Sequence, residues 1–139
     1  MKLSRYSDYA LRILIHLALH PDRLISIRQI ADIYGISQNH LMKIAQDLGH
    51  AGVIQTVRGR NGGLRLARPA EEITIGEVVR RTETRGPIVD CSGCLIARGC
   101  GLPPMFAEAQ EAFMSVLDRY SLADAAMRSD TLRHLFAVA

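Results

Sequence analysis

The order of apolar patterns in the first half of the chain most constrains its fold. Three segments carry apolar side chains at helical spacing, namely residues 3–19, 27–34 and 37–50. Two shorter segments then follow an alternating pattern, namely residues 53–57 and 64–67. A glycine-rich run, Arg58–Gly63, joins these two segments, and its Asn61-Gly62 pair is a strong hairpin signal. The sequence therefore predicts three helices followed directly by a two-stranded hairpin.

This order is that of a winged helix-turn-helix, in which the hairpin is the wing. We therefore expect a mainly α protein with a DNA-binding region over residues 1–83 and a wing over 54–67. Ser26 and Ser37 stand where the second and third helices need N-caps, and Gly35 suits the turn between them.

The third helix predicts how such a domain reads DNA. In this fold the N-terminal side chains of that helix reach base edges in the major groove, and its backbone N–H groups face phosphate. The residue types at its start suit this task, because Gln and Asn pair with adenine and Lys reaches guanine or phosphate. The expected contacts are Ser37, Gln38, Asn39, His40 and Lys43.

The hairpin carries basic residues without an acidic one. Four arginines occur within eleven residues, at positions 58, 60, 65 and 68, and they suit the minor groove or its phosphates. We expect Arg58, Arg60, Asn61 and Arg65 to contact DNA. The alternative is a hairpin that only adds solubility. The charge is also uneven, since residues 1–70 hold ten Lys and Arg against four Asp and Glu, whereas 71–139 hold seven against ten. A basic half suggests a face that meets a polyanion, and the alternative is an uneven but solvated surface.

The three cysteines of the chain lie together in a glycine- and proline-rich loop predicted over 84–103. Cys91, Cys94 and Cys100 read as a metal or redox site, because a clustered odd number does not form a disulfide framework. Four interpretations remain open from spacing alone: an iron–sulfur cluster, a zinc site completed by His or Asp, a Cys91–Cys94 redox pair, and unbound thiols. Three thiolates also leave a fourth ligand to be supplied.

A capping box, Thr74 to Glu77, predicts a helix that ends near residue 82, and a longer helix is expected from 104 to about 120. The longer helix has a heptad-like apolar stripe that favours dimerisation, which assigns 104–139 to a dimerisation helix and tail. The alternative is packing of this stripe on its own domain.

Composition limits the other classes of function. No apolar run reaches the roughly 18 residues of a membrane span, and Asp8 and Arg12 interrupt any signal-peptide layout, so we expect a cytoplasmic protein without membrane contact. Aromatic residues are only 5% and tryptophan is absent, which disfavours recognition by stacking on bases. The sequence shows no set of residues suited to acid–base or nucleophilic catalysis, so we do not expect an enzyme.

Several segments make the chain recognisable. SDYALRILIHLA (7–18), the wing VRGRNGGLRLARP (57–69) and LDRYSLADA (117–125) resemble the iron–sulfur winged-helix regulators, the family that includes IscR and RirA. The chain looks most like the members that sense nitric oxide. The resemblance implies a homodimer that binds double-stranded DNA at a palindromic operator as a repressor, and that releases it when nitric oxide attacks the cluster.

The same resemblance implies the cluster ligands. They are Cys91, Cys94 and Cys100, with Asp8 of the partner subunit as the fourth, around a 4Fe-4S or alternatively a 2Fe-2S cluster. The position that holds a histidine ligand in IscR is Pro103 here, and the first cysteine gap is shorter than the family's usual one. Asp8 alternatively pairs with Arg12 one helical turn away. Iron supply or an oxidant is the alternative signal, and a small redox protein is the alternative class.

Overall fold

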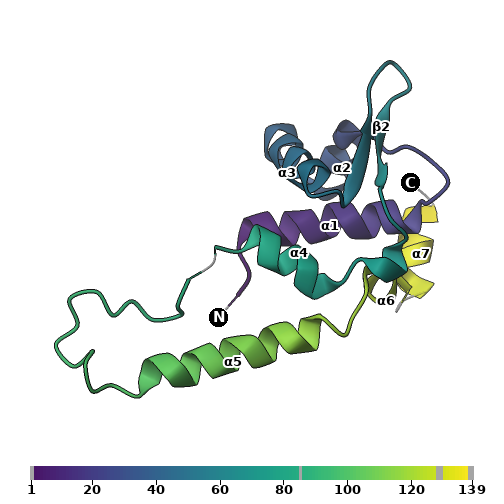
Figure 1. Ribbon diagram of the computed structural model, residues 1–139. Helices are drawn as coiled ribbons and strands as arrows, with labels where there is room; N and C mark the ends of the chain where they lie inside the picture. The colour runs from purple at the N-terminus through teal and green to yellow at the C-terminus, as the bar shows by residue number, and fades with distance from the viewer. Residues whose placement is uncertain (1, 85, 128–129, 138–139) are drawn as a thin grey trace.

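The computed structural model describes residues 2–84, 86–127 and 130–137. It is mainly helical, with one two-stranded sheet (Figure 1). The elements in chain order are α1 (Arg5–Leu19), α2 (Ile27–Tyr34), α3 (Gln38–His50), β1 (Ile54–Val57), β2 (Gly63–Leu66), the 3-10 turn η1 (Ala70–Glu72), α4 (Ile75–Thr82), α5 (Leu102–Leu117), α6 (Leu122–Met127) and α7 (Asp130–Ala137). The predicted mainly α winged helix-turn-helix is therefore confirmed.

Local signals in the sequence explain the ends of α2. The Ser26 hydroxyl accepts a hydrogen bond from the Gln29 backbone N–H, and the Gln29 side chain accepts one from the Ser26 N–H, which forms a capping box. Gly35 ends the helix with φ 62°, in the left-handed region that glycine occupies without strain. The chain then turns directly into α3.

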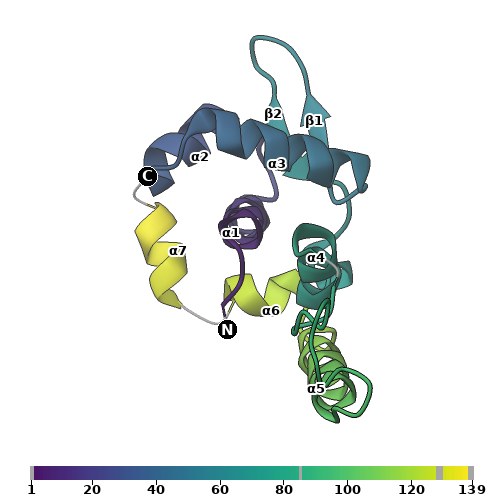
Figure 2. The ribbon, with the colours of Figure 1, turned by 90° about the vertical axis from the view of Figure 1, so that its left-hand side faces the viewer.

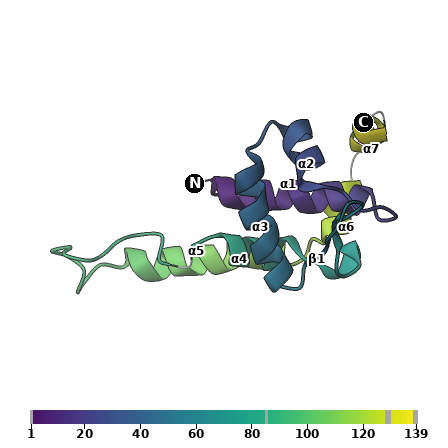
Figure 3. The ribbon, with the colours of Figure 1, turned by 90° about the horizontal axis from the view of Figure 1, so that it is seen from above.

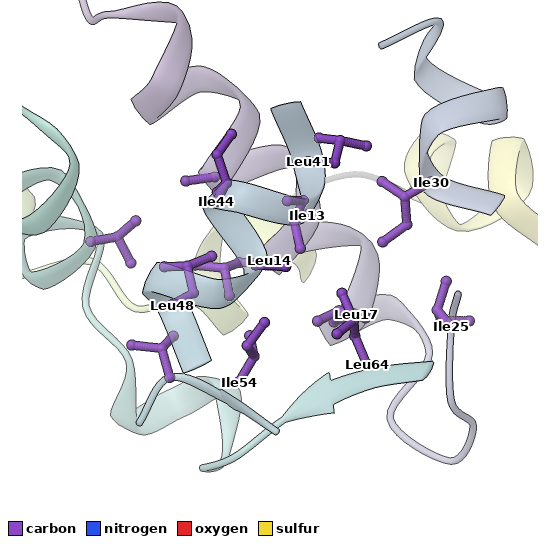
Figure 4. Close-up of a cluster of buried hydrophobic side chains, with 14 of the residues drawn as sticks. Ile13, Leu14, Leu17, Ile25, Ile30, Leu41, Ile44, Leu48, Ile54 and Leu64 are labelled. Atoms are coloured by element: carbon purple, nitrogen blue, oxygen red, sulfur yellow. The ribbon is translucent and has the colours of Figure 1, made fainter. Parts of the chain in front are cut away.

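The core lies around α1, which runs through the middle of the domain (Figure 2). Ile13, Leu14 and Leu17 of α1 are fully buried. They pack in one cluster with side chains of α3 and of the hairpin, including Leu41, Ile44, Leu48, Ile54 and Leu64 (Figure 4). Apolar burial of this kind is the main favourable contribution to folding, so α1 fixes where α3 and the wing sit.

A histidine shares the buried face of α1. His16 is only 2% exposed and stacks on His20 and edge-on against Tyr34. Burial, together with the positive charges of His20 and Arg23, lowers the pKa of His16 to about 4. His16 is therefore neutral near pH 7 and is compatible with an apolar core.

The hairpin and its glycine-rich turn form where the sequence predicts them, and the backbone shows which glycines shape the turn. Ile54 pairs with Leu66 and Val57 with Gly63, so the turn comprises residues 58–62. A two-residue Asn61-Gly62 turn would require a positive φ at Asn61, and no described residue other than glycine has one. The left-handed residue is Gly59, at φ 114°. Gly62 is needed for space instead, because a Cβ there would overlap the Val57 carbonyl oxygen.

The long helix α5 starts and ends about two to three residues earlier than expected, and it stands apart from the core. It lies on the far side of α4 from α1, with the cysteine loop extending beyond its N-terminus (Figures 1 and 3). The residue that follows α5 is Asp118. Its carboxylate accepts two hydrogen bonds of 2.5 Å from the guanidinium of Arg80 in α4. None of the side chains of α5 is buried, and Phe113 and Val116 are 37% and 41% exposed.

The remaining boundaries match the expectations closely. Thr74 caps α4, and the expected weakly helical tail forms α6 and α7. Gly49 lies inside α3, and Gly52 follows the helix with φ 70°. Each of the three predicted regions, 1–83, 84–103 and 104–139, includes positions outside the described residues. These positions are Met1, Arg85 and residues 128, 129, 138 and 139. None of the helices in the described ranges is both long and apolar enough to span a membrane.

Candidate functional site

The start of α3 presents the side chains that the sequence singles out for DNA. All of them are exposed, and none makes a side-chain hydrogen bond or ion pair within the described part of the chain: Ser37, Gln38, Asn39, His40 and Lys43. The opposite face of the same helix is buried through Leu41, Ile44 and Leu48. The helix is therefore anchored on one side and leaves its polar groups available on the other.

The N-terminus of α3 differs from those of its neighbours. Ser4, Ser26 and Thr74 each accept a hydrogen bond from a backbone N–H in the first turn of the helix that they cap. Ser37 makes no such bond, although it holds the equivalent position before α3. The first N–H groups of α3 and the Ser37 hydroxyl thus remain available to an external acceptor, such as a phosphate oxygen.

The arginines of the wing differ in whether they have a partner within the chain. Arg58, Arg60 and Asn61 at the tip are exposed and have no side-chain partner among the described residues. Arg65 donates to the Gln55 amide oxygen at 2.8 Å, across the pair that these two residues form in the sheet. Both remain exposed on one face of the wing.

Arg68, which the sequence groups with the basic wing, has a structural partner instead. Its guanidinium lies 2.6 Å from the Glu77 carboxylate of α4 and also donates to the Glu72 carbonyl oxygen at 3.3 Å. Since Arg68 ties the base of the wing to α4, the exposed arginines of the wing are Arg58 and Arg60 at the tip and Arg65 in β2.

The wing and α3 lie at one end of the molecule, and α5 and the cysteine loop lie towards the other (Figures 1 and 2). Arg28, at the start of α2 in the helix-turn-helix, is also exposed and has no side-chain partner among the described residues. The sequence analysis overlooked Arg28, although its place on the polar side of an amphipathic helix is visible in the spacing of Ile27, Ile30 and Ala31.

The cysteine loop is open to solvent. Cys91 and Cys100 are half-buried, Cys94 is exposed, and all three are free thiols. Two successive turns shape the backbone, with Cys94 N–H donating to the Cys91 carbonyl and Ala97 N–H to that of Cys94, each at 3.2 Å. Leu95 at the tip is 98% exposed.

The donor set fits a thiophilic metal centre in its chemistry. Three thiolates on one loop, separated by small residues such as Ser92 and Gly93, are soft ligands suited to iron–sulfur clusters or zinc. Within the described ranges, however, no three His, Cys, Asp or Glu side chains are grouped closely enough to hold a metal ion. A complete site thus requires the loop to gather its thiols and to obtain a further donor.

Asp8 lies in the first half of α1 and has a partner within its own helix. Its two carboxylate oxygens accept hydrogen bonds of 3.1 and 2.7 Å from Arg12, which is the alternative pairing expected from the sequence. Both side chains are more than 40% exposed. Exposed pairs of this kind contribute only a few tenths of a kcal/mol, so a stronger ligand interaction can replace this one.

Two contacts between distant segments had no signal in the sequence. Glu83, at the end of α4, binds Ser4 and Ser7 at the start of α1, and Tyr6 of α1 binds Asp47 of α3. These residues match no motif and are 41 to 79 positions apart, so only the fold brings them together.

The match to known proteins extends over almost the whole chain. Residues 3–128 fit the model of the Rrf2 family, described as an iron-dependent transcriptional regulator. The chain belongs to the Rrf2 family. Curated relatives of the chain are named HTH-type transcriptional regulator NsrR. The one from Bacillus subtilis is 46% identical over 141 residues, which cover 97% of each chain, and the one from Shouchella clausii is 45% identical over 97% of this chain and 95% of its own.

Solved structures share the Rrf2 architecture. The global cysteine regulator CymR of B. subtilis has a TM-score of 0.76 at 28% identity, over 94% of this chain and 99% of its own. IscR of T. potens has a TM-score of 0.75 at 25% identity, over 94% of this chain and 90% of its own. These Rrf2 proteins are transcriptional regulators, in agreement with the prediction that the chain is a DNA-binding regulator and not an enzyme.

The two serines that precede the helices of the helix-turn-helix are expected to respond differently to mutation. Ser26→Ala removes a capping bond and is expected to lower the free energy of unfolding by about 1 kcal/mol. Ser37→Ala removes no internal bond and is expected to leave it unchanged, but to weaken binding to duplex DNA. Urea unfolding and fluorescence anisotropy check the two effects. A stability loss for Ser37→Ala equal to that for Ser26→Ala would show that Ser37 is only a cap.

Proposed function

We propose that this chain is a homodimeric repressor that binds double-stranded DNA at a palindromic operator, senses nitric oxide through an iron–sulfur cluster, and then releases the operator. The observation that carries the DNA-binding part is the contrast at α3 and the wing. The exposed side chains at the start of α3 and at the tip of the wing have no partner among the described residues, whereas Arg65, Arg68 and the capping serines have internal partners. The NsrR-named relatives and the resemblance to nitric-oxide-sensitive regulators support the sensing part.

On DNA, the start of α3 enters the major groove, where Asn39 and Gln38 pair with base edges and Ser37 and Lys43 contact phosphate or guanine. The wing reaches the adjacent minor groove or its phosphates with Arg58 and Arg60. This division assigns sequence recognition mainly to α3 and position along the duplex mainly to the wing.

Dimerisation through α5 explains why this helix has no buried side chain within its own chain. Its exposed apolar residues include Met105, Phe113 and Val116. Tyr120, just beyond the helix, continues the apolar spacing of the predicted stripe. A second copy of α5 would remove this apolar surface from water. A two-fold dimer presents two α3 helices, which matches a palindromic operator.

In the proposed dimer, Cys91, Cys94 and Cys100 hold the cluster, and Asp8 of the partner subunit supplies the fourth donor. We favour a 4Fe-4S cluster over a 2Fe-2S cluster. Bound there, the cluster supplies iron atoms that react with nitric oxide. The protein's contribution is to release Asp8 from Arg12 and to hold the loop against the partner's α1, so that the loop conformation depends on the cluster. The cytoplasm is the compartment that such a DNA-binding regulator shares with its operator.

Release of DNA requires that the loaded dimer favour the spacing of the two α3 helices that fits the operator, since a ligand shifts an equilibrium only by its differential affinity for two states. An alternative signal, iron supply, is favoured by one observation, the iron-dependent description of the family model. The two signals are separated by adding either an iron chelator or nitric oxide and measuring the rate at which the protein then releases DNA.

The DNA contacts predict a specific pattern of losses. Asn39→Ala and Arg60→Ala are each expected to lower affinity by about tenfold or more for a duplex that the wild-type protein selects from a random library. Arg60→Ala is also expected to reduce the log–log salt slope by about 1, because it removes a phosphate contact. Arg119→Ala, an exposed arginine beyond α5, is the matched control and is expected to bind normally. Wild-type affinity in both test variants would contradict this interface.

The ligand set predicts the metal content. Protein purified without oxygen is expected to be brown and to contain iron and acid-labile sulfide, and Cys94→Ser is expected to lose most of both. Ser92→Ala, in the same turn, is the control and is expected to keep them. A colourless wild-type protein that takes up neither iron nor sulfide on reconstitution, or that binds zinc instead, would exclude the cluster while leaving the DNA interface untouched.

A further inference from the structure

The end of α4 leads directly into the cysteine loop and lies beside the start of α1 (Figure 1). A Glu83 carboxylate oxygen accepts hydrogen bonds from the Ser4 backbone N–H at 2.7 Å and from the Ser7 hydroxyl at 2.5 Å. The Ser7 hydroxyl oxygen also lies 2.7 Å from that of Thr82. The root of the loop is therefore fixed to the first turn of α1 by three contacts.

These contacts are partly protected from water. Ser7 is completely buried. Burial alone would raise the pKa of Glu83, but the hydrogen bonds from Ser7 and Ser4 outweigh it and hold this pKa below its ordinary value. Glu83 is therefore ionised near neutral pH, and its hydrogen bonds to α1 are charge-assisted.

The same turn of α1 has a second link, to α3. Tyr6, between Ser4 and Ser7, donates its hydroxyl proton to the Asp47 carboxylate in the second half of α3. Burial and this bond to a carboxylate raise the pKa of Tyr6 to about 12, which keeps the hydroxyl protonated as a donor. Asp8, the proposed ligand to the partner subunit's cluster, completes this turn.

We propose that the first turn of α1, residues 4–8, is the coupling element that transmits the state of the cysteine loop to the recognition helix α3. The inference rests on the proposed function of that loop. Displacement of the loop root moves Glu83, which pulls on Ser4 and Ser7. Because a helical turn moves as a rigid unit, Tyr6 then shifts Asp47 and with it the orientation of α3.

Removal of a single hydroxyl group, that of Tyr6, tests the coupling. The measured quantity is the ratio of operator affinities of the protein before and after nitric oxide treatment. Tyr6→Phe is expected to reduce this ratio by about tenfold, within the usual range of allosteric coupling. Tyr9→Phe removes a hydroxyl from the same helix that makes no hydrogen bond within the described residues, and it is expected to keep the wild-type ratio. An unchanged ratio in Tyr6→Phe would overturn the inference.

Ser7→Ala breaks the link at the other end. It is expected to reduce the ratio similarly, and the double variant is expected to add little, because both links act in series. If Ser7→Ala and Tyr6→Phe reduce the ratio independently and additively, the two links do not form one connection.

A readout without the cluster separates failure of this inference from failure of the proposed function. In cluster-free protein, Ser7→Ala is expected to increase amide hydrogen exchange severalfold around Asp47, a segment that it does not touch, whereas Tyr9→Phe is not. Unchanged exchange there would overturn the mechanical link. If the wild-type affinities before and after nitric oxide are equal but exchange responds as expected, the proposed sensing fails and the link stands.

Discussion

The buried face of α1 is the constraint on which the rest of the structure depends. Ala10, Ile13, Leu14 and Leu17 are fully or almost fully buried, and they meet α3, α4, α6 and the hairpin around one helix. Close-packed interiors of this kind change between discrete arrangements rather than deforming continuously. A displacement of α1 is therefore shared by α3 and the hairpin, the elements proposed to contact DNA. The first turn of α1 is the part of this helix that contacts Glu83, at the root of the cysteine loop.

Internal partners separate the structural residues of this chain from those available to ligands. Arg68 and Arg60 lie eight residues apart in one basic segment, yet Arg68 is paired with Glu77, whereas Arg60 has no partner among the described residues. Ser26 and Ser37 precede adjacent helices, yet only Ser26 caps its helix. The apolar face of α5 extends the same contrast to hydrophobic groups, because this helix has no buried side chain in its own chain, and the proposed dimer rests on that observation.

The elements could be predicted from sequence because their signals are local. The capping box at Ser26, the left-handed Gly35 and the apolar periodicity of α1 each act within a few residues, and each is present in the structure. The glycine-rich turn of the wing was also predicted to within one residue, although its positive φ is at Gly59 and Gly62 is required for space.

The contacts between distant segments could not be predicted. Pairing of Arg68 with Glu77, of Glu83 with Ser7 and of Tyr6 with Asp47 depends on how α1, α3 and α4 pack. The fourth donor of the proposed cluster depends on a second subunit, which no periodicity within one chain describes. The sequence thus singled out the residues proposed to face DNA and the three thiols, but gave no sign of the contacts proposed to couple them.

The most direct test of nitric-oxide sensing follows DNA binding and cluster absorbance in a single sample. Protein purified without oxygen is bound to a labelled operator duplex at constant salt, and nitric oxide is added in steps. Loss of the cluster absorbance in parallel with release of the duplex is the expected result. A duplex that stays bound while the absorbance disappears, or a cluster that does not react with nitric oxide, would contradict this function.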